Sequence, residues 1–220
     1  MNAPRVARHA PGPSTEPGDT ADLELDERRL QVVAEQAAGL RWQIALTAVI
    51  VAAIAAAAVP KGLIALWLVS VVASREWRAI ALVRMARDRA RPIADRLLAT
   101  VRRNALIGAC NGSAALFMAW LDTTLAAVLT MILVSWGAGA VSTSSTVLRA
   151  FVAYAALLFV PTAAMWIVRG SWLGWGVAAL VLMFFGVQIR FARRNLETFE
   201  ESYRVRLENL ALAERLASEQ

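Results

Sequence analysis

Six long apolar stretches follow one another through the middle of the chain, separated by short polar segments. Each is close to the roughly 17–25 residues that an α-helix needs to cross a bilayer. They occupy residues 43–60, 62–83, 105–121, 123–141, 148–168 and 171–189. Tight turns around Lys61, Asp122 and Arg169 alternate with longer connections. The pattern predicts an all-α, polytopic membrane protein with six transmembrane helices arranged as three hairpins. This six-helix bundle would cover residues 43–189.

The segments outside this bundle have patterns of their own. Residues 1–20 are rich in proline and lack a hydrophobic period, which predicts a disordered tail. Residues 21–42 carry apolar side chains at three- to four-residue spacing, which predicts a cytoplasmic helix leading into the membrane. Residues 190–220 contain no proline or glycine, so we expect one continuous cytoplasmic helix leaving the sixth span.

Composition and charge agree with a membrane location. Hydrophobic residues make up 58% of the 220 residues, more than the 45–50% or so of soluble domains. The net charge of +6 would suggest a nucleic-acid partner in a soluble chain. Here 21 of the 23 basic residues flank one side of the predicted bundle, and only Lys61 and Arg169 flank the other. This bias predicts that both termini are cytoplasmic, in a bacterial inner membrane, and that no nucleic acid binds.

A charged cluster, Arg75, Glu76 and Arg78, interrupts the second stretch before it is long enough to cross a bilayer. The 13 residues that precede it rise only about 20 Å, against a hydrocarbon core of about 30 Å. The i±3 and i±4 neighbours of Glu76 are all apolar, so we expect its partner on another helix. Arginines at comparable depth are Arg41, Arg149 and Arg190. An ordinary interfacial cluster without special pairing stays equally open.

The start of the third stretch, with the residue before it, places Asn104, Gly108, Asn111 and Gly112 close together, with the two glycines in a GxxxG pattern. Small residues let helices approach closely, and an asparagine in hydrocarbon needs a hydrogen-bond partner. Helix packing is the favoured interpretation, and a ligand pocket near Asn111 and Cys110 is the alternative.

Proline at position 161 falls inside the fifth stretch. It frees a backbone carbonyl and bends the helix. Pro161 is therefore either a static kink, which we favour, or a hinge that moves during signalling.

An apolar seam runs along the predicted exit helix. Its members are Leu196, Phe199, Tyr203, Leu207 and Leu210. Seams at this spacing pair with other helices, so we expect a homodimer through this helix, an ordinary surface helix being the alternative.

The basic segment 84–103 either binds anionic lipid headgroups or reflects only the charge bias.

Chemistry-bearing motifs are sparse. His9 and Cys110 are the only histidine and cysteine, so neither a disulfide within the chain nor a His/Cys metal site is expected. Neither a Walker loop nor GxGxxG is present. We expect no cofactor and no catalytic activity from these 220 residues.

Four stretches together resemble a known class of input region: "LQVVAEQ" before the bundle, "LWLVSVVASREWR" in the second span, "GSWLGWG" at residues 170–176, and "RLENLALAERLASEQ" at the end. The chain is similar over residues 25–220 to the N-terminal membrane sensor region of bacterial hybrid sensor histidine kinases of two-component systems, and of some diguanylate cyclases. It departs from them in lacking a phospho-accepting histidine in the exit helix, an ATP-binding domain and a GGDEF-type domain. The resemblance implies either an input module alone or a truncated product, and a longer parent protein would be a histidine kinase.

We therefore expect a membrane sensor that passes a signal of unknown ligand or bilayer origin through its C-terminal helix. The alternatives are a small multi-pass transporter or channel subunit and a membrane scaffold. A transporter predicts a continuous polar path through the bundle, which Asn104, Asn111, Thr130 and Ser135 supply only sparsely.

Overall fold

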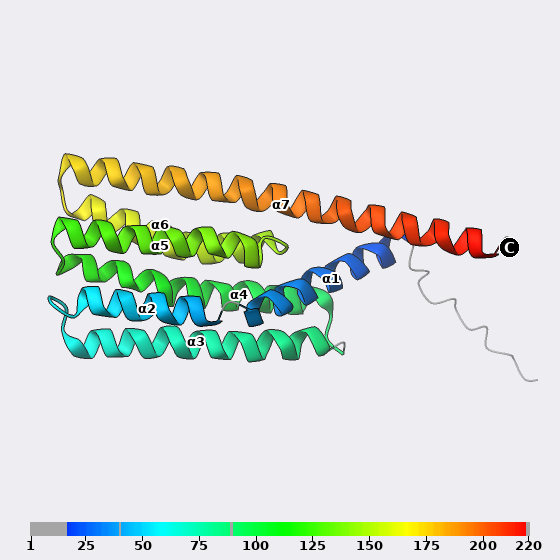
Figure 1. Ribbon diagram of the computed structural model, residues 1–220, viewed down its shortest axis with the longest axis horizontal. Coiled ribbons are helices and arrows are strands. Elements are labelled where there is room, and N and C mark those ends of the chain that lie inside the picture. Colours follow the sequence, from blue (N-terminus) through cyan, green and yellow to red (C-terminus); the bar gives the residue numbers. More distant parts are fainter. Residues whose placement is uncertain (1–16, 40, 89, 219–220) are drawn as a thin grey trace, which may run out of the picture.

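A computed structural model describes residues 17–39, 41–88 and 90–218, and each regular element in these ranges is a helix (Figure 1). The elements are α1 (Pro17–Gly39), α2 (Arg41–Ala55), α3 (Lys61–Arg87), α4 (Ile93–Gly112), the 3₁₀ helix η1 (Ser113–Ala119), α5 (Thr123–Ser144), α6 (Leu148–Val168) and α7 (Trp172–Ser218). The predicted all-α class is confirmed for the described residues.

Helices α2 to α6 and the first half of α7 lie alongside one another, and successive helices reverse direction (Figure 1). Helix α6 is central, since it packs against α4, α5 and α7. Helix α7 continues well past one end of the bundle, and α1 lies obliquely at that same end. We call this the inner end, because the charge pattern predicts that it faces the cytoplasm.

Three helices, α5, α6 and α7, are long and apolar enough to span a membrane. Helix α2 has only 15 residues, and α3 and α4 carry charged side chains along part of their length. Membrane crossing by these three helices, and hence the six-span hairpin topology, stays a prediction.

Several predicted boundaries differ from the structure. The N-terminal helix begins at Pro17 rather than residue 21, consistent with the suitability of proline for a first helical turn. Residues 1–16 of the predicted tail lie outside the described residues. The first stretch, 43–60, ends as a helix at Ala55. The third stretch, 105–121, is the end of α4 followed by η1 rather than one α-helix.

The main core is rich in aromatic side chains whose polar atoms are bonded. Trp67 stacks on Trp136 with ring centroids 6.4 Å apart and meets Phe117 edge-on at 5.5 Å. The indole N–H of Trp67 donates to the Cys110 carbonyl at 3.0 Å, and that of Trp136 donates to Thr47 Oγ1 at 2.8 Å. Because buried indoles need such acceptors, these bonds fix the rings in the core.

The turns at the outer end are locally well specified. Asp122 caps α5 by accepting a hydrogen bond from the Leu125 amide at 2.8 Å. Gly170 adopts φ +70° just past α6, the left-handed conformation that commonly ends a helix. Arg169 donates to the carbonyls of Met118 and Leu121 at 2.7 and 3.0 Å, and so ties the end of α6 to η1 and the turn that follows it.

Candidate functional site: the inner end of the bundle

A group of polar side chains, some buried and some half-buried, lies between α3, α4, α6 and the end of α5. We call it the inner polar cluster: Arg78 bonds to Ser144, Asn111 bonds to Tyr154, and Arg75 and Arg78 both influence Tyr154. Asn104 of α4 and Thr146, just before α6, are buried polar residues that we include with it. It unites two sets of residues that the sequence singled out separately, the arginines of the second stretch and the asparagines of the third.

The two arginines point into the bundle. Arg78 donates from Nη2 to Ser144 Oγ at 3.4 Å, and both arginines are near enough to Tyr154 to interact with its hydroxyl electrostatically. The Nε atoms of Arg75 and Arg78 are buried and have no hydrogen-bond partner within the described part of the chain. These two donor atoms therefore lack an acceptor among the described residues.

Asparagine side chains form the α4 side of the cluster. Asn111 is fully buried and donates from Nδ2 to Tyr154 Oη at 3.1 Å. Asn104, 2% exposed, lies two turns nearer the inner end. Asn104 Nδ2, Asn111 Oδ1 and Thr146 Oγ1 are buried without a hydrogen-bond partner among the described residues. Such groups are costly to bury, so this region is a candidate for rearrangement or for binding.

Glu76 does not belong to this buried set. Its side chain is exposed on α3, whereas those of Arg75 and Arg78 are half-buried. The side chain of Arg41, one of its predicted partners, lies outside the described residues. An inter-helix ion pair of Glu76 stays a prediction.

The glycines of the third stretch lie against the backbone of α6. A Cβ atom on Gly108 would lie 2.4 Å from the Tyr154 carbonyl oxygen, and one on Gly112 would lie 2.0 Å from that of Leu157. Pro161 stands four residues after Leu157 and has no N–H to donate to that carbonyl. Gly112 therefore gives room to the carbonyl that Pro161 leaves free.

A second hydrophobic core attaches α1 to the inner end. Val33 and Ala34 of α1 pack with Leu82 and Met85 of α3 and with Val147 and Ala150 at the start of α6. Val33 and Leu82 are fully buried. Helix α1 is therefore part of the packed structure.

An ion pair with a buried arginine and a partly exposed carboxylate reinforces this attachment. Arg96 on α4, 3% exposed, donates from Nη2 to Glu27 Oε1 of α1 and from Nη1 to Glu27 Oε2 at 3.3 Å. Its Nη1 also donates to the Met85 carbonyl at 3.3 Å. The two-pronged geometry suits an arginine–carboxylate pair, and it joins α1, α3 and α4 at one point.

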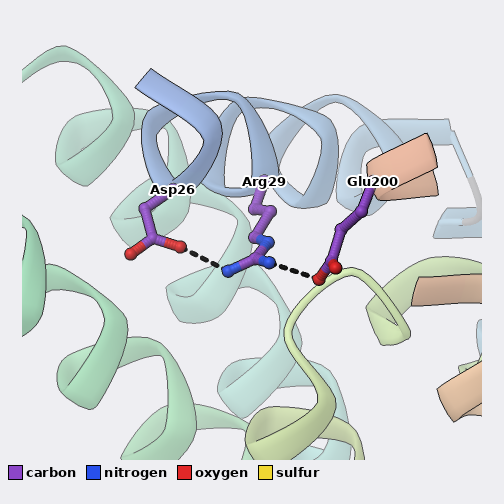
Figure 2. Close-up of polar contacts among 3 residues, drawn as sticks. All are labelled: Asp26, Arg29 and Glu200. Atoms are coloured by element: carbon purple, nitrogen blue, oxygen red, sulfur yellow. Dashed lines mark hydrogen bonds and ion pairs between the residues drawn. The ribbon is translucent and has the colours of Figure 1, made fainter. Parts of the chain in front are cut away.

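The other face of α1 reaches the exit helix. Figure 2 shows Arg29 between two carboxylates: Nη1 donates to Asp26 Oδ1 at 2.5 Å within α1, and Nη2 donates to Glu200 Oε1 on α7. Helix α1 thus bonds to the bundle through Glu27 and to α7 through Arg29.

Glu200 lies on the same side of α7 as the predicted exit seam. It follows Leu196 by four residues and precedes Tyr203 by three and Leu207 by seven, so these side chains share a helix face. Leu196, Phe199 and Tyr203 are half-buried in the single chain, and Leu207 is exposed. The side chain of Leu210 lies outside the described residues.

Sequence reasoning missed the ion pairs of α1. A signal for Arg96 was present, because the face of α4 that carries Asn104 and Gly108 continues at four-residue steps through Thr100 to Arg96. All four residues are buried. The partners Glu27 and Glu200 lie 69 and 171 positions from their arginines, so local spacing cannot indicate them.

The chemistry of this end is that of hydrogen bonding and charge pairing. The side chains here keep one protonation state near neutral pH, because they are those of arginine, asparagine, serine, threonine and tyrosine. Within the described ranges, no group of three or more histidine, cysteine, aspartate or glutamate side chains is placed to hold a metal ion. No protein-family model, curated protein or solved structure matches the chain.

Proposed function

We propose that the chain is the membrane-embedded input module of a bacterial signalling protein, and that it passes changes in bundle packing to its C-terminal helix. One observation carries this proposal: α1 is bonded both to the bundle, through Glu27 and Arg96, and to α7, through Arg29 and Glu200. A change at the inner end therefore has a physical route to the exit helix.

Each step of this route joins elements with defined contacts. The inner polar cluster bonds α4 to α6 through Asn111 and Tyr154, and α3 to the end of α5 through Arg78 and Ser144. The second core and Arg96 hold α1 on α3, α4 and the start of α6. A shift of α3 or α4 would move α1 and strain the contact of Arg29 with Glu200. A stimulus produces such a shift only by favouring one arrangement over the other.

The exit seam supplies the output step of this proposal. Helix α7 is one unbroken helix of 47 residues, so a rotation or displacement near Glu200 is transmitted along it. We propose that α7 pairs with the same helix of a second copy, and that α1 competes for the pairing face. The output domain expected after such a helix is a histidine kinase.

The core supports signalling better than solute transport. Apart from the inner polar cluster, the core of the bundle is filled largely by buried apolar and aromatic side chains, among them Trp67, Trp136, Phe159 and Trp166. Thr130, a buried polar residue in this part of the core, accepts the indole N–H of Trp166 at 2.8 Å. A conducting path would need open polar groups there.

A fusion tests the proposal. The complete chain is joined after Gln220 to a histidine-kinase catalytic region, and autophosphorylation is measured in membrane vesicles. Inserting one to seven alanines after Ser218 is expected to make the rate rise and fall with the helical period, because each residue rotates the output by about 100°. Arg29→Gln is expected to change the rate several-fold, whereas Arg28→Gln serves as the matched control on α1.

A rate that is indifferent to both the insertions and Arg29→Gln contradicts the input-module proposal. The same purified chain in liposomes is expected to give no ion or solute flux. A flux that the bare liposomes lack would favour the transporter alternative instead.

A further inference from the structure

The inner ends of α3 and α4 form an open hollow of about 620 Å³, which the signalling route described above does not use. Its lining includes Trp77 of α3, Arg91 of the connecting segment, and Asp95, Leu98, Arg102 and Arg103 of α4. Trp77, Arg91, Asp95, Leu98 and Arg102 are all exposed, so the hollow opens on the surface.

Positive charge dominates the lining, with three arginines against Asp95. Arg91 pairs with Asp88 at 3.2 Å. Neither Arg102 nor Arg103 has a carboxylate oxygen within 4 Å in the described residues. Asp95 lies in the first turn of α4, where the helix dipole favours a negative charge. The hollow therefore has two guanidinium groups available to an anion.

One of these guanidiniums has a defined position. Arg103 lies over the Trp77 ring, with Cζ 5.2 Å from the ring centroid, and its Nη1 approaches Met85 Sδ at 2.7 Å. Partial burial, and to a smaller extent the positive charge of Arg91, lowers the pKa of Arg103. A bound anion would offset both effects, because it favours the charged form of the guanidinium.

An apolar surface adjoins the hollow. Ile80 lies one turn from Trp77 on α3, and Leu106 lies one turn from Arg102 on α4. Trp77, Ile80, Leu98 and Leu106 are each about half exposed. A free phosphate would leave this surface uncovered, whereas the acyl chains of a phospholipid would cover it. Tryptophan beside arginine is also the composition of the membrane interface.

We propose that this hollow binds the phosphodiester headgroup of an anionic phospholipid, with Arg102 and Arg103 as the phosphate ligands and Trp77 as the platform. The glycerol and acyl chains would lie along Leu98 and Leu106. The basic segment 84–103 would then bind one lipid at one defined place, in addition to the general attraction that positive flanks exert on anionic membranes.

The test compares lipid binding by the purified full chain in detergent, using native mass spectrometry and the melting temperature. Phosphatidylglycerol is expected to stay bound and to raise the melting temperature, while phosphatidylcholine and inorganic phosphate do neither. Arg102→Gln with Arg103→Gln is expected to abolish at least half of the shift. Arg190→Gln with Arg194→Gln, which removes two exposed arginines of α7, is expected to leave it intact.

Equal losses in the two double variants would overturn the proposal, because they would mean that only overall charge matters. Equal stabilisation by inorganic phosphate would overturn it in favour of a simple anion site. Trp77→Ala keeps every charge and tests the platform if the double variant fails to fold. Its retention of phosphatidylglycerol at the wild-type level would count against the hollow.

Discussion

Arg29 and Glu200, 171 positions apart in the sequence, join the first helix of the described structure to the last (Figure 2). Both side chains are partly exposed, at 23% and 34%. The pair is therefore worth little to overall stability. Its importance lies in its position, because Glu200 shares a face of α7 with the residues proposed to pair two copies of the chain.

Releasing this ion pair should favour pairing of the exit helices. We expect Glu200→Gln to increase disulfide crosslinking of Leu207→Cys, in a Cys110→Ser background, in native membranes. A partly exposed pair contributes about 0.5–1 kcal/mol, which corresponds to a roughly two- to fivefold shift in the pairing equilibrium. Glu201→Gln alters the neighbouring exposed carboxylate and is the matched control. The same crosslinked fraction in both variants would argue against competition by α1.

The pair between Glu27 and Arg96 should be far more important for stability. Glu27→Gln leaves the guanidinium of Arg96, which is 3% exposed, without its carboxylate. Loss of one partner of a buried pair costs about 3 kcal/mol, or about a hundredfold in an opening equilibrium. Hydrogen–deuterium exchange should therefore accelerate in α1. Glu24→Gln, at an exposed position of the same helix, should leave exchange unchanged, and similar exchange in both variants would show that Arg96 does not hold α1.

The contact of Gly112 with Leu157 should not tolerate a side chain. Gly112→Ala places Cβ 2.0 Å from a backbone oxygen, and α4 and α6 must separate to accept it. We expect a loss of about 1–3 kcal/mol, typical of overpacking, seen as a lower melting temperature in detergent. Gly186→Ala is the control, because its Cβ would meet no described atom within 4 Å. An unchanged melting temperature for Gly112→Ala would mean that the two helices are not closely packed in solution.

The helices that the sequence predicts best are those bounded by strong local signals. The stretch 148–168 matches α6, and 123–141 matches most of α5. Asp122 caps one of these helices and Gly170 follows the other, so both boundaries rest on residues with defined backbone preferences. The uninterrupted sequence after the last stretch also predicts the unbroken course of α7.

The sequence is a poorer guide where polar side chains are buried. Helix α4 begins at Ile93, well before the apolar stretch at 105, because Arg96, Thr100 and Asn104 face other helices. A hydropathy pattern places such residues in a polar connection. Their burial depends on contacts with Glu27, Met85 and α6 that no spacing along the chain specifies.

Within the inner polar cluster, the hydrogen bond between Asn111 and Tyr154 should stabilise the fold. Tyr154→Phe keeps the ring but removes the acceptor for Asn111 Nδ2. Asn111 is fully buried, and its Oδ1 has no hydrogen-bond partner within the described residues. In this variant neither Nδ2 nor Oδ1 of Asn111 would have a hydrogen-bond partner among the described residues, at a cost of about 1–3 kcal/mol. The melting temperature in detergent should therefore fall. Tyr203, the only other tyrosine, is half-buried on α7. Tyr203→Phe should therefore change the melting temperature little. Equal melting temperatures for the two variants would mean that Asn111 has another partner, because an amide left unbonded in this core must destabilise the fold.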